Sequence, residues 1–386
     1  MATDQSHTDR RVEGRLLVTV RDRVGGEPRW ASAPGDTICR VLEAKGLTTE
    51  DLADCLGISD PDARRLAGGE MAVDAEIAAA LARLLGSTPD FWMRREEQYR
   101  ASLRWLGADE LARRSPIAEM VRFGWLQSEA GWKDQAASLL SYFDVSDAAQ
   151  WDRTWASRLG EALYRTSASF TSNEMSVAVW LRRAEVEASR QSLQVWSPSR
   201  LREAVPRIRQ LSKVGDPSRF LPRIAELLAA AGVALVVLRA PSENRLSGAA
   251  FKLGESARAI ALTGRHLAED HLWFTLFHEI GHLLLHDGEG DFLDALDADD
   301  AKYSATEEEA NDFARTTLFP SGIEALATSR ASGPTKRQVV AFAATCGVAP
   351  GVVVGRLHHD GVLAYNQLNG LVRRYRWRDQ TLSLRT

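Results

Sequence analysis

Short apolar segments at helical spacing, separated by turn residues, run through the first hundred residues of the chain. Glycines and capping Ser or Thr residues bound most of them, as expected for helix ends. The predicted helices are Thr37–Lys45, Thr49–Leu56, Pro61–Ala67 and Asp74–Leu85. Short helices of this kind with a turn at Gly57-Ile58-Ser59 are typical of a helix-turn-helix unit. We therefore predict a helix-turn-helix domain over residues 36–100.

The segment before this domain, residues 1–35, reads as a polar leader. Its Val24-Gly25-Gly26 turn, after a brief alternation of apolar and polar residues, indicates a short hairpin.

A helical connector is predicted over residues 101–200. This stretch is rich in Trp and Ala, and its apolar positions recur three and four residues apart, so its tryptophans are expected in cores or interfaces. The composition shifts near Ser197-Pro198-Ser199, where we place a boundary. Beyond it the pattern predicts a helix and two β-runs, Leu221–Ala231, Val233–Leu238 and Ala257–Leu262.

The C-terminal segment, residues 326–386, is predicted to be helical. Val339–Leu363 has a second helix-turn-helix rhythm, with Gly347-Val348 as the turn. The tail Arg373–Arg378 is basic with interleaved aromatic residues. We favour a helical cap on the preceding domain with an exposed cationic face; contact with nucleic acid is the alternative.

Composition narrows the class of protein without naming a function. The chain has 386 residues, 45% hydrophobic and 26% charged, with a net charge of −4, which is ordinary for a globular protein of two or three domains. Its three cysteines form no CxxC pair, which favours a reducing compartment. No apolar run approaches the roughly 18 residues of a membrane helix, and the N-terminus lacks a signal segment. We expect a cytoplasmic protein without a membrane partner.

The most informative stretch is His278-Glu279-Ile280-Gly281-His282, an HExxH sequence within an apolar helical pattern. Residues four apart share one helix face, so His278 and His282 can present their imidazoles to one metal ion. Glu279 lies one position further round, where its carboxylate can reach a water on that metal. Two satisfied core histidines are the competing interpretation, and the apolar flanks weigh against it.

A catalytic zinc needs a third protein ligand and an open position. Glu307 and Asn311, one turn apart on a following predicted helix, supply it: Glu307 as ligand and Asn311 as a hydrogen-bond partner of a ligand. A solvated first turn of acidic residues is the alternative interpretation. Glu309 is the second choice for the third ligand.

Three neighbouring features complete the expected site. His286 lies one turn beyond His282, too far along a straight helix to share its ion, and is expected to support a ligand or face solvent. The run Ala257–Leu262 before the helix is expected to offer an edge strand to an extended peptide. His266, His271 and Tyr303 are nearby candidates for a second oxyanion donor.

An acidic run follows the histidines. It contains Asp287, Glu289, Asp291, Asp294, Asp297, Asp299 and Asp300. A solvated loop is the favoured interpretation, and a lid that prefers basic substrates is the alternative.

The expected chemistry follows from the ligands. Two neutral histidines and one carboxylate leave Zn²⁺ with net positive charge, which lowers the pKa of its water. Glu279 then acts as the base that takes the proton and passes it to the leaving amine of a peptide.

These residues resemble the ImmA/IrrE family of metallo-endopeptidases, which carry HExxH followed by ExxAN-x-FA. Here the second motif reads Glu307-Glu308-Glu309-Ala310-Asn311-Asp312-Phe313-Ala314, and Leu318-Phe319-Pro320 follows. The resemblance covers about residues 215–325. It implies a zincin-like peptidase domain over 201–325, and an enzyme that cleaves repressor proteins to release stress or mobile-element genes. The fold class predicted for the whole chain is α+β and mostly α, with a small β-sheet in the peptidase domain.

The N-terminal domain separately resembles the helix-turn-helix of HigA-type antitoxins. The matching residues include Asp51-Leu52-Ala53 and Leu56-Gly57-Ile58-Ser59. Residues 36–100 nevertheless hold eight Lys or Arg against thirteen Asp or Glu, a local charge of −5, whereas phosphate contacts normally supply much of the affinity for DNA. DNA binding would rest on Arg64 and Arg65. A protein-binding or dimerising role, as in a homodimer, is the alternative.

Three functions are therefore open. The first is a zinc endopeptidase that cleaves a regulatory protein, a repressor or an antitoxin-like one, coupled to the helix-turn-helix module. The second is a DNA-binding transcriptional regulator or antitoxin whose peptidase-like domain is a sensor or scaffold. The third is a metal-binding scaffold without turnover. The intact Glu279 favours the first.

Overall fold

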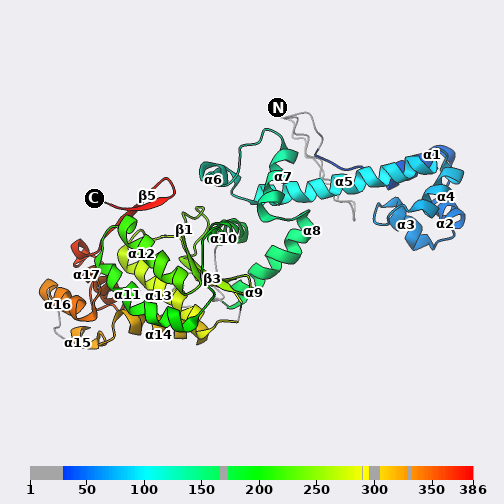
Figure 1. Ribbon diagram of the computed structural model, residues 1–386. Helices are drawn as coiled ribbons and strands as arrows, with labels where there is room; N and C mark the ends of the chain where they lie inside the picture. The colour runs from blue at the N-terminus through cyan, green and yellow to red at the C-terminus, as the bar shows by residue number, and fades with distance from the viewer. Residues whose placement is uncertain (1–28, 166–172, 289, 295–304, 328–332, 386) are drawn as a thin grey trace, which may run out of the picture. The chain divides into compact units, whose positions relative to one another are not determined.

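The computed structural model describes residues 29–165, 173–288, 290–294, 305–327 and 333–385 (Figure 1). The chain divides into two compact units. The first is Met1–Leu111 with Glu129–Ala137, and the second is Ala112–Ser128 with Ser138–Thr386. The hairpin expected at Val24-Gly25-Gly26 lies outside the described residues.

The first unit is helical. It contains α1 (Pro34–Lys45), α2 (Thr49–Leu56), α3 (Asp60–Ala67), α4 (Ala75–Leu85) and most of α5 (Pro89–Arg114). Figure 1 shows α1 to α4 gathered around the N-terminal part of α5. The helices predicted here are confirmed within a few residues at their ends.

The predicted turn forms because its residues suit the two helix ends. Thr48 caps α2 by accepting a hydrogen bond from the Asp51 amide, and Gly57 ends α2 in the left-handed conformation at φ 63°. Ser59 then caps α3. Glycine takes this φ without the steric cost that a side chain adds. The α2–turn–α3 arrangement therefore follows from local sequence.

The second unit holds a helical connector and a mixed α/β domain. Its connector helices are α6 (Ile117–Arg122), α7 (Trp132–Phe143, shared with the first unit), α8 (Ala148–Trp151), the π-helical turn η1 (Asp152–Ala156), α9 (Ser157–Arg165) and α10 (Glu174–Ser189). Trp151, Trp155 and Trp180 are buried in it, as expected for this tryptophan-rich stretch.

The sheet of the mixed domain has four described strands in the order β1-β3-β2-β4. They are β1 (Val233–Val237), β2 (Gly248–Leu253), β3 (Ala257–Leu262) and β4 (Phe292–Asp294). β1 is parallel to β3, whereas β2 is antiparallel to both β3 and β4. The prediction that Ala257–Leu262 forms an edge strand is wrong, because β1 and β2 pair with it on either side. Strand order depends on pairing partners distant in sequence, and local pattern does not encode it.

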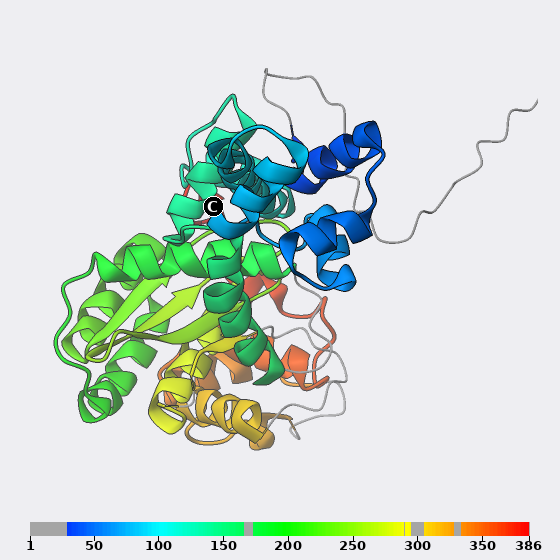
Figure 2. The ribbon, with the colours of Figure 1, turned by 90° about the vertical axis from the view of Figure 1, so that its right-hand side faces the viewer.

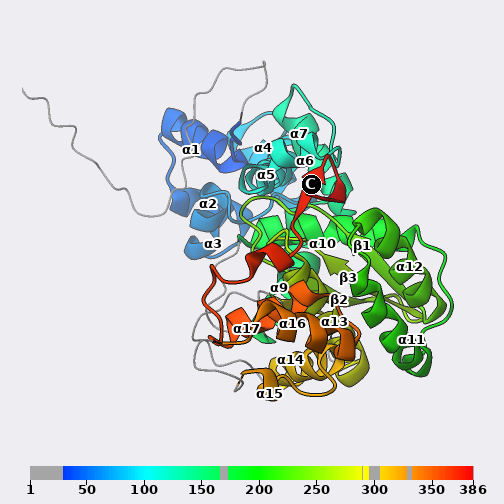
Figure 3. The same ribbon diagram turned by 90° about the vertical axis from the view of Figure 1, so that its left-hand side faces the viewer.

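Helices cover both faces of this sheet. After α10, the helices of the mixed domain are α11 (Pro198–Gln210), η2 (Leu211–Lys213), α12 (Pro217–Ala230), α13 (Glu269–Leu285), α14 (Ala305–Leu318), α15 (Glu324–Ala327), α16 (Lys336–Cys346) and α17 (Pro350–His359). Figures 2 and 3 show α10 on one side of the sheet and α13 on the other. α13 packs against β2 and β3, and its far side meets α14 and α17. A mostly helical N-terminal region followed by a mixed α/β domain confirms the predicted fold class.

The C-terminal segment belongs to the core of the mixed domain. Val339, Ala343, Val352 and Leu357 are buried in the same hydrophobic cluster as Phe277 and Ile280 of α13. After η3 (Asn369–Leu371), the strands β5 (Tyr375–Arg378) and β6 (Thr381–Leu384) form a hairpin where the sequence predicted helix. Buried α17 packs against α13 as part of this core.

Within the described residues, no single helix is long and apolar enough to cross a membrane. Among the helices that the structure describes, α16 and α17 meet that length and composition only as a pair, which is bent by 111°.

Candidate metal centre

Helix α13 buries two histidines one turn apart. His278 and His282 are both 0% exposed, and their Nε2 atoms lie 2.9 Å from each other. The ring of Phe292, on β4, stacks on His282 with centroids 4.2 Å apart and planes at 13°, which holds the plane of that imidazole. Both Nε2 atoms are therefore directed at one point beside the helix.

Helix α14 brings the carboxylate of Glu307 to the same point. Its Oε2 lies 3.2 Å from His278 Nε2 and its Oε1 lies 3.6 Å from His282 Nε2. Gly281 makes the approach of the two helices close, because a Cβ there would stand 3.2 Å from Phe313 and 3.3 Å from the Ala310 backbone. Glu307 is only 4% exposed.

These three side chains fit a zinc ion. They are the one His/Cys/Asp/Glu group among the described residues whose ligand atoms gather within 4.8 Å of one another. A tetrahedral zinc with bonds of about 2.0–2.2 Å keeps its ligand atoms about 3.3–3.6 Å apart. The observed separations of 2.9, 3.2 and 3.6 Å are close to that requirement.

The electrostatics keep these side chains in the forms that can bind a metal ion. Burial lowers the pKa of His282 to about 4, despite the opposing contact with the Glu307 carboxylate, so the imidazole is neutral at pH 7. Burial alone would raise the pKa of Glu307, but the close contacts with His278 and His282 and their charge interactions outweigh it and lower that pKa. Neutral histidine and anionic carboxylate are the forms that bind zinc.

Asn311 contacts a candidate ligand, as its spacing from Glu307 predicted. Its Oδ1 is 3.1 Å from His278 Nδ1, so it accepts the Nδ1 hydrogen when Nε2 is committed to a metal. The amide thereby fixes the orientation of that imidazole.

Glu279 is completely buried beside the ligands. Its carboxylate lies directly against Gly248 of β2, where a Cβ would stand 2.3 Å from Oε1. Sequence analysis missed Gly248, and nothing local in the sequence indicates it, because the contact joins residues from a strand and a helix.

The HExxH helix, the downstream glutamate and this small sheet all lie in one contiguous part of the chain. Residues 233–358 match the Peptidase_M78 family, the IrrE N-terminal-like domain. No curated protein matches the chain significantly. The chain thus carries an M78 domain with a buried His-His-Glu cluster, and the M78 match ends within α17.

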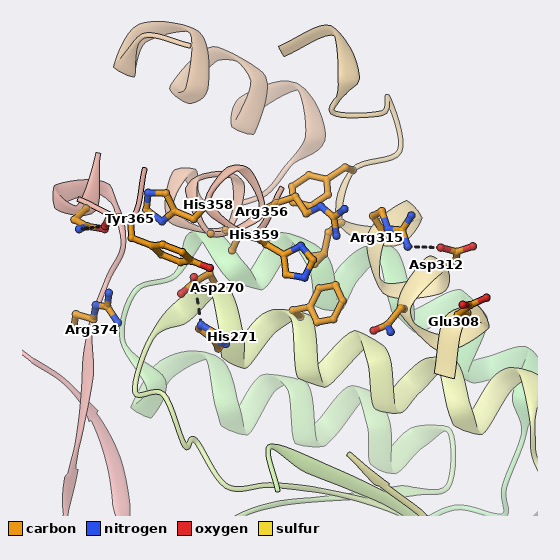
Figure 4. Close-up of a pocket in the computed structure, with 17 residues that line it drawn as sticks. Asp270, His271, Glu308, Asp312, Arg315, Arg356, His358, His359, Tyr365 and Arg374 are labelled. Carbon is orange, nitrogen blue, oxygen red and sulfur yellow. Dashed lines mark hydrogen bonds and ion pairs between the residues drawn. The ribbon is translucent and has the colours of Figure 1, made fainter. Parts of the chain in front are cut away.

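A cavity of about 480 Å³ in the mixed domain borders α13 and α14, although His278, His282, Glu307 and Glu279 are not among its lining residues. Its walls come from α13, α14, α17 and the segment that follows α17 (Figure 4). Phe274, Leu318, Phe319 and Val352 give it apolar surface. It also contains Asn311, and the Phe274 ring lies 6.4 Å from the His278 ring, so the cavity adjoins the outer side of that ligand.

The other sequence candidates take different places. His286 is 4% exposed, so it does not face solvent, and it lies between His282 and Glu309. The Glu309 side chain is 64% exposed and does not join the ligand cluster. His266 and His271 stack on each other with ring centroids 4.0 Å apart, whereas Tyr303 lies outside the described residues.

Part of the acidic run is structural rather than solvated. Asp287 pairs with Arg258 at 2.6 Å and accepts a hydrogen bond from Trp196, and Asp291 pairs with Arg158. Glu289 and Asp297, Asp299 and Asp300 lie outside the described residues.

In the first unit, Arg64 and Arg65 are both exposed on α3. Arg65 forms an ion pair with Asp62 at 3.2 Å. The pairing compensates part of the positive charge that this helix would offer to a phosphate.

Proposed function

We propose that this chain is a zinc-dependent endopeptidase, with His278, His282 and Glu307 as metal ligands and Glu279 as the general base. The observation that carries the proposal is the convergence of three buried ligand atoms next to a buried carboxylate within an M78 domain. A structural zinc site would use four protein ligands, whereas three leave a position open for chemistry.

When bound, zinc supplies a Lewis acid that polarises the scissile carbonyl and acidifies the attacking water. Glu279 accepts the proton of that water and then delivers it to the leaving amine. Asn311 and Phe292 hold the two imidazoles in place. The cavity beside His278 offers apolar surface to side chains of a bound peptide.

For the substrate, we propose a regulatory protein, either a repressor or an antitoxin-like protein. The ImmA/IrrE resemblance supports this class, and so does a helical module with an α2–turn–α3 arrangement on the same chain. Such a module offers a surface for a regulatory partner.

Glu279→Gln tests the proposal. The variant should bind zinc like the wild type, because Glu279 is not a ligand, and lose about 10²–10⁴-fold in cleavage rate, because an amide does not accept the proton. Zinc content by elemental analysis and cleavage of small repressors encoded by neighbouring genes are the measurements. A variant that cleaves at the wild-type rate removes Glu279 from the mechanism. Full zinc content in a His278→Ala, His282→Ala double variant would contradict the ligand assignment.

A DNA-binding regulator with a sensing M78 domain is the second candidate. The observation in its favour is the exposure of Arg64 and Arg65 on the helix that follows the turn. Cleavage by the wild type and its loss in Glu279→Gln would distinguish the enzyme from this regulator.

A further inference from the structure

His286 and Glu309 lie immediately outside the metal ligand His282. His286 Nδ1 is 3.2 Å from His282 Nδ1, and its Nε2 is 3.0 Å from Glu309 Oε2. His286 is buried at the C-terminal end of α13, while Glu309 on α14 reaches it from the surface. The three side chains thus form a continuous row from solvent to the candidate metal site.

The direction of these hydrogen bonds follows from the outermost member. A carboxylate only accepts, so neutral His286 must carry its hydrogen on Nε2 and donate it to Glu309. Its Nδ1 is then an acceptor, which requires the hydrogen of His282 to be on Nδ1. The Nε2 lone pair of His282 consequently faces Glu307 and His278.

We propose that the His286–Glu309 pair is a positioning device that sets the tautomer and the orientation of His282 for metal binding. The inference rests on the proposed zinc site. Phe292 fixes the plane of the His282 ring, and the His286–Glu309 pair decides which of its nitrogens is turned inward. Asn311 of α14 orients His278 directly. Glu309, also on α14, acts on His282 through His286.

A simple ion pair between two helices is the competing explanation. A doubly protonated His286 would donate from both nitrogens, and His282 would then accept on Nδ1 and carry its hydrogen on Nε2. That hydrogen would occupy the position of the metal bond. The two explanations therefore predict opposite tautomers of His282.

Zinc affinity in a variant series, measured by competition with a chromogenic chelator, tests the proposal. His286→Ala leaves the Nδ1 hydrogen of His282 without its acceptor and should weaken zinc binding about 10–100-fold. His286→Asn places an amide oxygen near the position of Nδ1 and should recover most of that loss. Glu309→Gln keeps an acceptor and should bind like the wild type, whereas Glu309→Ala should bind more weakly.

Glu308→Ala is the matched control for Glu309→Ala. It removes an exposed carboxylate from the same helical turn, but its side chain lines the cavity instead of contacting His286. Equal losses in the two alanine variants would mean that only negative charge matters, which would overturn the proposal. So would equal losses in His286→Ala and His286→Asn when thermal melts show both folded.

The ¹⁵N NMR spectrum of the His282 ring provides a readout independent of zinc affinity and of cleavage. We expect Nδ1 to be protonated and Nε2 unprotonated in both zinc-free and zinc-loaded protein. In zinc-free Glu309→Ala, we expect both tautomers of His282 to be populated. An Nε2-protonated His282 in zinc-free wild type would overturn the proposal. Zinc binding with the expected tautomer but no peptidase activity would instead refute the proposed function alone.

Discussion

At the residue scale, Glu279 and Gly248 lie so close together that the strand position has room for glycine only. A buried carboxylate is costly to desolvate and keeps its position only where the surrounding groups leave room for it. Gly248 leaves that room, because any side chain there would meet Oε1 at 2.3 Å and the Thr275 methyl group at 2.7 Å. The position of the Glu279 carboxylate thus depends on a strand residue without a side chain.

Gly248→Ala should therefore move Glu279 while leaving the metal ligands in place. We expect zinc binding to persist and the cleavage rate to fall by about 10²-fold, because a displacement of about 1 Å from the reacting atoms has that effect. Zinc content and cleavage rate measured on one preparation test this. Gly160→Ala is the control, since a Cβ there meets nothing within 4 Å. Unchanged cleavage in Gly248→Ala would show that the base tolerates displacement.

The lowered pKa of His282 makes the stability of the zinc-free protein depend on pH. Its pKa is about 4 in the folded protein, because of burial, and ordinarily 6.5. Between these values the unfolded chain binds more protons, so the free energy of unfolding should fall as the pH drops from 6.5 to 4, by up to about 3 kcal/mol. Urea unfolding of zinc-free wild type and His282→Gln at several pH values measures it. Identical pH profiles of the two proteins would contradict the prediction.

At the scale of elements, α13 connects the candidate catalytic groups with the cavity. Its buried face carries His278 and His282, and one turn before them Phe274 enters the cavity wall. α17 closes the cavity from the other side through Val352 and residues near Gly355. Changes on α17 can therefore alter the cavity without touching a ligand.

Val352→Trp should fill much of the cavity and leave the metal site intact. If the cavity receives part of the peptide, KM should rise severalfold, with little change in zinc content. Val340→Trp, on an exposed position of α16, is the control for adding an indole. Steady-state kinetics on the wild type and both variants measure the effect. An unchanged KM in a folded Val352→Trp protein would place the substrate elsewhere.

At the scale of the whole molecule, the helical first unit and the M78-containing second unit are built around separate cores. The first unit contributes no residue to the His-His-Glu cluster. Its role is therefore open to a test that does not involve the metal site.

Measurement of DNA binding tests the role of the first unit. If the module binds DNA, replacing both Arg64 and Arg65 by Ala should weaken binding by about 1–3 kcal/mol. The salt dependence of binding should also decrease, because a protein that contacts fewer phosphates releases fewer counterions on binding. Fluorescence anisotropy with the protein's own promoter at about 50 mM salt measures it. Arg40→Ala, on α1, is a control for charge. No binding by the wild type would favour a protein-binding or dimerising module.

The sequence alone determined the features that depend on local spacing. Residues four apart on a helix share a face wherever that helix packs, so the HExxH pattern was sufficient to pair His278 with His282. The capped helices around Gly57 and the runs that became β1 and β3 were also local, since cap chemistry and apolar patterning set them. The Glu307 and Asn311 pair was predicted from its spacing, and the structure brings both residues to the histidines.

The tertiary structure decided which distant segments meet. It placed β3 inside the sheet, set Gly248 against Glu279, and joined His286 to Glu309 across two helices. It also made a hairpin of residues 375–384 and buried α17 in the M78 core. The physical reason is common to all of these: packing and pairing energies depend on contacts between residues far apart in the chain, and no local pattern specifies the partner.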